Sequence, residues 1–416
     1  MAPELNWFFW LFVSLYLAYL IVEFGLDFLN LRYMKQHGAE VPELFKDYFS
    51  QSDYEKSQDY TQAKTHFSWV KRSFDVLVFW ALLLSGGFEY LQELLTALPV
   101  GPFWQSVAYP FALGAFFYFL GLPFNYYQQF VLEERFGFNR MKIGTFVGDQ
   151  VKSLALALMI GLPLVALIFK IVLSLGSYWW IVAWAVMMIF QFLTAALFPI
   201  LLAPLFYKFT PLPDGELKEK IEALAKKLNF KMSGIFSMDG SKRSAHSNAF
   251  FAGVGRTRRI VLFDTLIEAL TVPEILAVLA HEMGHNVKKH VSKGLVLSSL
   301  TTLAGFWLLS LCLNWPDFYQ AFGVSTPSLA IGFTLFGFAS SVFTFPLTPI
   351  FNWKSRLHEY EADAFSLETL GQGQDLAASL LKMTKDNLSQ PKPHPWYSFY
   401  HYSHPTTAER VQALRV

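Results

Sequence analysis

Long apolar runs dominate the sequence and limit the folds it can adopt more than any other feature. Hydrophobic residues make up 53% of the 416 residues and charged residues only 16%, whereas about a quarter of a typical soluble domain is charged. A run of about 18 or more apolar residues can cross a bilayer as a helix. Seven runs reach this length, near residues 7–26, 75–98, 104–124, 153–176, 178–206, 294–315 and 327–350. We therefore expect a mainly α-helical membrane protein with seven transmembrane helices.

Two details qualify these spans. The first run has no Lys or Arg before it and is long enough to span, so it is predicted to be a retained anchor rather than a cleaved signal peptide. The fifth and seventh runs contain prolines, which membrane helices tolerate where neighbours satisfy the freed backbone groups. These prolines are Pro199, Pro204, Pro346 and Pro349.

Lys and Arg are distributed unevenly between the joining segments. The basic segments are 27–74, 125–152, 207–293 and 351–416, whereas the turns near 99–103, 177 and 316–326 carry neither residue. The positive-inside rule then places the N-terminus outside and the C-terminus in the cytoplasm. The net charge of +1 gives no bulk basic signal, so no nucleic-acid partner is expected. The single cysteine, Cys312, excludes an intrachain disulfide framework.

The motif HEMGH at residues 281–285 follows a predicted helix start at Pro273. Residues i and i+4 share one face of a helix, so His281 and His285 can bind the same ion. Glu282 can reach a water on that ion without being a ligand. This is the HExxH pattern of zinc proteases, with two imidazole ligands and a glutamate general base.

A catalytic zinc ion needs a third protein ligand. The extended motif requires Gly three residues and His six residues after the second histidine, but Lys288 and Val291 occupy these positions. His290 falls off the shared face and is predicted to be a surface residue near the membrane boundary. The third ligand must therefore come from elsewhere in the chain.

A second predicted helix, SRLHEYEADAFSLETL at residues 355–370, offers a carboxylate. Glu359 and Asp363 are four positions apart on one face. The glutamate can bind the ion while the aspartate holds a ligand histidine through its second ring nitrogen. Glu361 points away from this face. Spacing leaves His358 open as a rival ligand.

These segments together resemble the integral-membrane CAAX prenyl proteases, a family of zinc metalloproteases with eukaryotic and bacterial members. Besides HEMGH and SRLHEYEADAF, the resemblance rests on three blocks in the family order. They are LPFNYYQQFVLEERFGFNRMKIGTFVGDQVKS (122–153), GSKRSAHSNAFFAGVGRTRRIVLFDTL (240–266) and HPTTAER (404–410). The shorter heat-shock membrane proteases share the zinc residues, but they have fewer spans and no counterpart of the 122–153 block.

The resemblance implies a fold and a set of site residues. The fold is a barrel of seven long helices around a large water-filled chamber, with a zincin-like α+β metalloprotease domain on the cytoplasmic side. The resemblance assigns Glu359 as the third ligand and Asp363 as the residue behind a ligand. It also implies that SNAFFAG is an edge strand to which the substrate adds a strand, through Asn248, Ala249 and Phe250.

The same resemblance brings further polar residues near the zinc. His404 is expected either to hydrogen-bond the oxyanion of a tetrahedral intermediate or to form a structural His-Pro turn. His401 is a nearby alternative. Arg356 is expected to orient Glu359 or to bind a substrate carboxylate, and His246 lies beside the edge strand.

The spans and motifs divide the chain into four parts: 1–206 with transmembrane helices 1–5, 207–293 with the edge strand and the HExxH helix, 294–350 with transmembrane helices 6–7, and 351–416 with the third zinc ligand. In the second part, Asp214 is predicted to cap a helix. Residues 233–238, 248–254 and 259–266 are predicted to be strands.

We therefore expect a membrane-embedded zinc endopeptidase with one Zn²⁺ per chain and with Glu282 as general base. The resemblance implies removal of the C-terminal tripeptide from prenylated CAAX proteins.

The expected partners of the protein are a peptide or prenylated peptide substrate and the lipid bilayer, and the enzyme is expected to work as a monomer. The short loop 316–326 and the ending VQALRV, which lacks a dilysine signal, favour a bacterial inner membrane over the endoplasmic reticulum.

Two alternatives accompany this expectation. One is a quality-control metalloprotease that acts on membrane proteins without a prenyl group. The other is a seven-helix transporter, which would use ionisable residues inside its spans. Glu23, Glu89 and Lys170 lie within or near the spans. The transporter interpretation leaves the two complementary zinc motifs unexplained.

Overall fold

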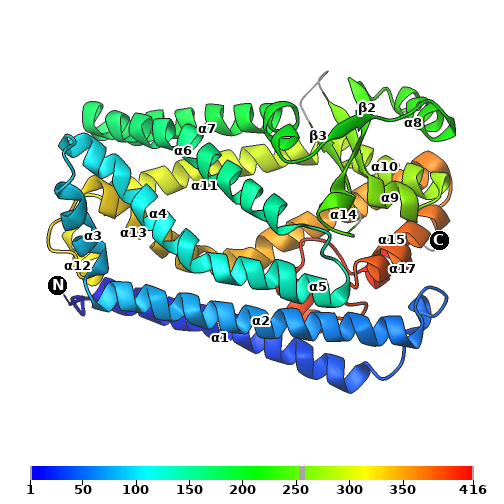
Figure 1. Ribbon diagram of the computed structural model, residues 1–416, viewed down its shortest axis with the longest axis horizontal. Helices are drawn as coiled ribbons and strands as arrows, with labels where there is room; N and C mark the ends of the chain where they lie inside the picture. Colours follow the sequence, from blue (N-terminus) through cyan, green and yellow to red (C-terminus); the bar gives the residue numbers. More distant parts are fainter. Residues whose placement is uncertain (1, 247, 253–257, 415–416) are drawn as a thin grey trace.

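The computed structural model describes residues 2–246, 248–252 and 258–414, most of them in helices (Figure 1). The long helices are α1 (Trp7–His37), α2 (Gln51–Leu84), α4 (Pro102–Tyr127), α6 (Ile143–Ser174), α7 (Trp179–Leu197), α10 (Val272–Val287), α11 (His290–Cys312), α13 (Leu329–Thr344) and α14 (Thr348–Leu370). The shorter helices are α3 (Gly87–Thr96), α5 (Glu133–Phe136), α8 (Glu216–Lys227), α9 (Asp264–Ala269), α12 (Pro316–Ala321), α15 (Gln374–Asp386), α16 (Pro395–His401) and α17 (Thr407–Leu414). The strands are β1 (Phe209–Pro211), β2 (Gly234–Met238), β3 (Ala249–Ala252) and β4 (Arg259–Phe263).

Six stretches of helix in the described residues are long and apolar enough to cross a membrane, and a bent pair raises the number to seven. The pair is α2 and α3, which meet at an angle of 66° and contain the run predicted at 75–98. Gly86 lies at the bend with φ 72°, a left-handed conformation that glycine adopts without strain. Hydropathy thus identified the apolar segment but not its break.

Prolines make the fifth and seventh predicted runs irregular. Helix α7 passes into a π turn at Phe198–Leu202 and then a 3₁₀ turn at Ala203–Leu205. Helix α13 passes through a 3₁₀ turn at Phe345–Leu347 into α14, and the two form one candidate span from Leu329 to Leu370. The helix that carries the predicted third ligand is therefore a direct continuation of a membrane helix.

The long membrane helices run side by side along the long axis of the molecule (Figure 1). Helix α4 contacts α6, α6 contacts α7, and α7 contacts α11, while α13 contacts α1, α4 and α11. In the most apolar window of each candidate span, the buried share of residues is at most 33% and is 17% or less in five of the six. Such low burial fits helices that contact their neighbours along part of their surface and leave the remaining apolar surface for lipid.

The two ends of the molecule are built differently. A cluster of buried aromatic side chains lies at the end of the molecule that contains the N-terminus, α3 and α12 (Figure 1). Its fully buried members include Phe12, Phe88, Tyr109, Phe318 and Phe322. A second hydrophobic core lies at the opposite end, under the small sheet and helices α8 to α10. The predicted zinc motifs belong to this second end.

The small sheet has the strand order β1-β2-β4-β3, with β2 and β4 parallel and the other pairs antiparallel. Strand β3 therefore lies at an edge of the sheet. The predicted strands are all present with shorter bounds, and residues 253 and 254 of the predicted 248–254 strand lie outside the described residues. Strand β1 was not predicted. Asp214 does not cap α8, because Gly215 holds that position and the Asp214 carboxylate pairs with Lys218.

Candidate metal centre

Helix α10 carries the HExxH motif, and local interactions fix where it starts. Thr271 and Glu274 form a capping box, in which the Glu274 carboxylate accepts from the Thr271 N–H at 2.8 Å. Pro273 occupies the first turn, where its missing N–H leaves no intrahelical bond unmade. Lys382 of α15 pairs with the buried Glu274 at 2.7 Å. The helix is thus anchored about two turns before its first histidine.

Helices α10 and α14 approach each other closely at Gly284. A Cβ at this position would lie 3.2 Å from both the Ala362 Cα and the Phe365 Cβ. The Ser366 hydroxyl adds a hydrogen bond across the same contact, donating to the Ala277 carbonyl at 2.9 Å. The glycine inside HEMGH therefore has a packing reason: it lets α14 come near enough for a carboxylate to reach both histidines.

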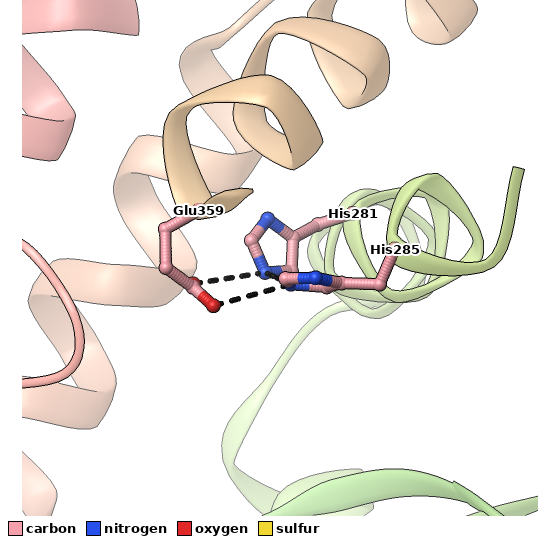
Figure 2. Close-up of side chains that lie close together, drawn as sticks. All are labelled: His281, His285 and Glu359. Carbon is pink, nitrogen blue, oxygen red and sulfur yellow. Dashed lines mark hydrogen bonds and ion pairs between the residues drawn. The ribbon is translucent and has the colours of Figure 1, made fainter. Parts of the chain in front are cut away.

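The structure brings the three predicted ligands together. In Figure 2 the Glu359 carboxylate points at both imidazole rings. Its Oε1 lies 3.2 Å from His285 Nε2, and its Oε2 lies 3.4 Å from His281 Nε2. The donor atoms of these residues all lie within 4.8 Å of one another. His358 is not part of this group, so among the described residues the geometry favours Glu359 as the third ligand.

The chemistry of this donor set fits a bound zinc ion. Two imidazoles and one glutamate form a ligand set found in catalytic zinc sites. The two Nε2 atoms are 3.2 Å apart, and a tetrahedral zinc ion with bonds of about 2.0–2.1 Å separates two ring nitrogens by roughly 3.3 Å. Glu359 Oε2 is buried and accepts no hydrogen bond among the described residues, and its contacts with His281 Nε2 at 3.4 Å and Arg410 Nη1 at 3.8 Å are long. A cation held between this carboxylate and the two imidazoles would satisfy the oxygen.

Asp363 and Arg410 support His281 from behind. The His281 Nδ1 lies 2.8 Å from Asp363 Oδ1, as expected for the predicted aspartate partner. The Arg410 guanidinium forms a fork with the same carboxylate through Nε at 2.8 Å and Nη2 at 2.6 Å. All three side chains are at most 10% exposed. Sequence reasoning missed Arg410, although it lies in the quoted HPTTAER block.

His290 and Glu361 support His285 on the other side. His290 Nδ1 lies 3.0 Å from His285 Nδ1, and His290 Nε2 lies 2.8 Å from Glu361 Oε2. The His290 side chain is 4% exposed, so the prediction of a surface residue is wrong. The first turn of α11 folds its ring back onto α10 and α14. The rival ligand His358 instead stacks on His290, with ring centroids 4.1 Å apart.

Glu282 is adjacent to the first histidine and is partly buried. Burial raises the pKa of its carboxyl, and the nearby His281 and His285 oppose this shift. A raised pKa makes a carboxylate a stronger base, and so better able to take up a proton from water. This property suits the predicted general base.

The segment after α16 brings His404 to the same place. Its Nε2 lies 3.4 Å from Glu359 Oε1, and its side chain is 62% exposed, so it remains open to a ligand. Arg356 does not orient Glu359 as expected: its Nη1 donates to the carbonyls of Phe399 at 3.0 Å and Tyr402 at 2.6 Å. Arg356 therefore holds the segment that leads to His404. His401 is placed elsewhere, with its ring against Tyr397.

Edge strand β3 belongs to the same core as the HExxH helix. Ala249 and Phe251 pack in the cluster that contains Leu279 and Met283 of α10. Asn248 precedes the strand: its carbonyl accepts from the Phe263 N–H at 3.1 Å, and its side chain accepts from the Ala249 N–H at 2.8 Å. Phe250 lies on the opposite face from Ala249, since side chains alternate along a strand.

Comparisons with known proteins agree with this architecture. Residues 30–208 match a family model described as CAAX prenyl protease N-terminal, five membrane helices, and residues 211–416 match that of peptidase family M48. The chain is 36% identical to a CAAX prenyl protease 1 homolog of Arabidopsis thaliana, over 95% of this chain and 94% of the relative. The chain belongs to the CAAX prenyl protease family.

Other members of the CAAX prenyl protease family show the same correspondence. The chain is 38% identical to CAAX prenyl protease 1 of Saccharomyces cerevisiae, over 92% of this chain and 90% of the relative. It matches the crystal structure of S. mikatae Ste24p with a TM-score of 0.92 at 34% identity, and 100% of each chain is covered. The protein is therefore an integral-membrane metallopeptidase, and the predicted enzyme class and fold are confirmed over the transporter alternative.

Proposed function

We propose that this protein is a zinc-dependent endopeptidase that cleaves prenylated CAAX proteins. The observation that carries the proposal is the group of His281, His285 and Glu359, on a fold that matches a CAAX prenyl protease along its whole length. The relatives are named for CAAX processing, which favours this function over quality control of non-prenylated proteins.

The side chains have distinct roles in the proposed mechanism. Zinc held by the three ligands would supply Lewis acidity to a water and to the scissile carbonyl. Glu282 takes a proton from the attacking water and returns it to the leaving amine. His404 faces the same space and donates a hydrogen bond to the oxyanion. Asp363 and Arg410 keep the His281 ring oriented so that its Nε2 faces the ion.

The substrate binds in this proposal as an added strand. Strand β3 uses its backbone on one side to pair with β4, and its other side lies at the edge of the sheet. An extended peptide can pair with such an edge through Asn248, Ala249 and Phe250, because main-chain hydrogen bonds need no particular side chains. The prenyl group would remain among the apolar helices.

The first experiment separates metal binding from chemistry. The purified protein is incubated with a farnesylated CAAX peptide, and products and zinc content are measured by mass spectrometry. A Glu282→Gln variant should retain zinc and lose cleavage by about 10²-fold or more, since general base catalysis contributes roughly 10²–10⁴-fold. Full activity in this variant would contradict the mechanism, and full activity after zinc removal would contradict the cofactor.

The second experiment addresses the substrate class. The same peptide is compared with and without its prenyl group, at equal concentrations. Preferential release of the tripeptide from the prenylated form supports CAAX processing, and equal cleavage of both supports the quality-control alternative.

Two further properties belong to the proposal. The C-terminal side, which contains both ligand helices, faces the cytoplasm, and a single chain is active because it supplies every donor atom itself. Protease protection of tags at each terminus in sealed vesicles tests the orientation, and light scattering of the active species tests the monomer. The bacterial location stays a prediction.

A further inference from the structure

The block around residues 133–149 has no role in the mechanism above, yet it holds the segment that leads into β3. A short antiparallel ladder joins the two. The Arg140 N–H donates to the Arg243 carbonyl at 3.2 Å, and the Ala245 N–H donates to the Phe138 carbonyl at 3.1 Å. An isolated antiparallel bridge lies between these contacts. The chain just before the edge strand is therefore paired with a segment between α5 and α6.

An ion pair fastens this ladder to helix α6. Arg243 forms a fork with Asp149, through Nε at 2.9 Å and Nη2 at 3.1 Å. Both side chains are largely buried, at 12% and 16% exposed. Two-point contacts of this kind fix direction as well as distance. The start of the segment is thus held by a helix that also spans the membrane.

His246 comes directly after the ladder and contacts three separate parts of the chain. Its ring stacks on Phe138 with centroids 4.0 Å apart and planes at 19°. Its Nδ1 lies 3.0 Å from Asn387 Oδ1 at the end of α15, and its Nε2 lies 3.6 Å from Glu133 Oε2. Its carbonyl accepts from the Thr265 hydroxyl at 3.0 Å. A single side chain therefore ties the approach to β3 to α5 and α15.

The groups that hold His246 are themselves fixed. The Tyr60 hydroxyl of α2 donates to both oxygens of Glu133, at 2.9 and 3.1 Å. A buried cluster of Tyr60, Phe136, Phe138 and Leu388 lies beneath the contact. Burial on this scale makes the support rigid, since protein interiors are close-packed.

The metal-binding helix does not depend on this support. Helix α10 is fixed by its own capping box, by Lys382 and by its close contact with α14. Strand β3 has β4 on one side and needs its other side for a substrate. Its Ala249 and Phe251 side chains pack in the core shared with α10, and the contacts before Asn248 fix where along its length the strand begins.

We propose that His246, held between Glu133 and Asn387, is a positioning residue that fixes the register in which β3 presents itself to a substrate strand. The inference rests on the proposed use of β3 as the substrate-binding edge. A slip of one residue moves a paired strand by about 3.3 Å and turns each side chain to the other face. After such a slip, a different peptide bond of the substrate would lie next to Glu282. His246 would therefore determine which peptide bond is cut.

The experiment uses the zinc-loaded full-length protein and a farnesylated CAAX peptide. In His246→Leu, kcat/KM should fall by about a hundredfold or more, since a misplacement of only about 1 Å can cost that much, with zinc content unchanged. Products cut one residue away should appear in the mass spectrum. His246→Gln, which keeps a hydrogen-bonding group, should restore most of the rate and the single product. His37→Leu, at an exposed histidine at the end of α1, is the matched control. Loss of rate with only the normal product, and no rescue by glutamine, would overturn the proposal.

A second measurement does not depend on activity. Hydrogen–deuterium exchange should be at least about tenfold faster in β3 of His246→Leu, with α10 unchanged, because the opening is local. If His246→Leu does not fold, Glu133→Gln provides the same comparison. Unchanged exchange in β3 would overturn the inference. Absence of any peptide cleavage by the wild-type protein would contradict the proposed function instead, while the exchange experiment would still decide the role of His246.

Discussion

His281 and His285 lie one turn apart on the same helix, but the groups behind them differ in burial and in charge. His281 is backed by the ion pair of Asp363 and Arg410, which is almost fully buried. His285 is backed by His290, whose other nitrogen meets Glu361, a carboxylate that is 48% exposed. His281 is thus supported by a buried ion pair. His285 is supported by a buried histidine that contacts a solvent-exposed carboxylate.

This difference predicts unequal sensitivity to mutation. A buried charge that loses its partner is left uncompensated, whereas an exposed carboxylate can be replaced by water. We therefore expect the His281 side to determine both stability and metal affinity, and the His285 side to adjust affinity alone.

Arg410→Ala should have the largest effect. It leaves the Asp363 carboxylate buried without its guanidinium partner, and breaking a buried pair costs about 3–5 kcal/mol. The variant should show a lower Tm and weaker zinc binding, measured by differential scanning fluorimetry and by competition with a chelator. Arg32→Ala, at an exposed arginine, is the control. An unchanged Tm in Arg410→Ala would contradict the claim that the His281 side contributes more to stability than the His285 side.

Asp363→Asn should weaken metal binding and also lower the Tm. The neutral amide leaves the buried Arg410 guanidinium without its carboxylate partner and removes the charge that holds the His281 ring. One amide oxygen can still accept from Arg410, so the loss of stability should be smaller than in Arg410→Ala. Removal of such a partner lowers metal affinity by about 10–100-fold. Chelator competition measures this change, and it should exceed the change in any variant on the His285 side.

His290→Ala and Glu361→Gln should have the smallest effects. We expect about tenfold weaker zinc binding for His290→Ala, at the lower end of the range for such partners, and a change of about threefold or less for Glu361→Gln, because exposed pairs contribute little. The d–d absorption of the cobalt-substituted protein reports any change in ligand geometry. A loss in His290→Ala equal to that in Asp363→Asn would show that the two sides are equivalent.

The parts of the site that could be predicted are those set by local spacing. Helix geometry places His281 and His285 on one face, and Glu359 and Asp363 on another. The choice of Glu359 over His358 came from the family resemblance and not from spacing. The apolar runs likewise predicted the spans. In both cases the information lies within a few turns of one helix.

The parts that were missed depend on contacts between distant segments. Arg410 reaches Asp363 from α17, and His290 folds back from α11 onto α10. Arg356 was expected to orient Glu359 or to bind a substrate carboxylate, but it bonds to two carbonyls that precede His404. The bend between α2 and α3 depends on a glycine conformation that hydropathy does not register.

The direct passage of α13 into α14 has a consequence for how the enzyme is made. His281 and Glu359 are separated in the chain by two membrane helices, so they meet only after α11 and α13 have been inserted and packed. Arg410 follows still later, from α17. During synthesis the nascent chain therefore lacks a complete ligand set until α14 has been made. The metal centre is thus a product of assembly and belongs to no single segment of the chain.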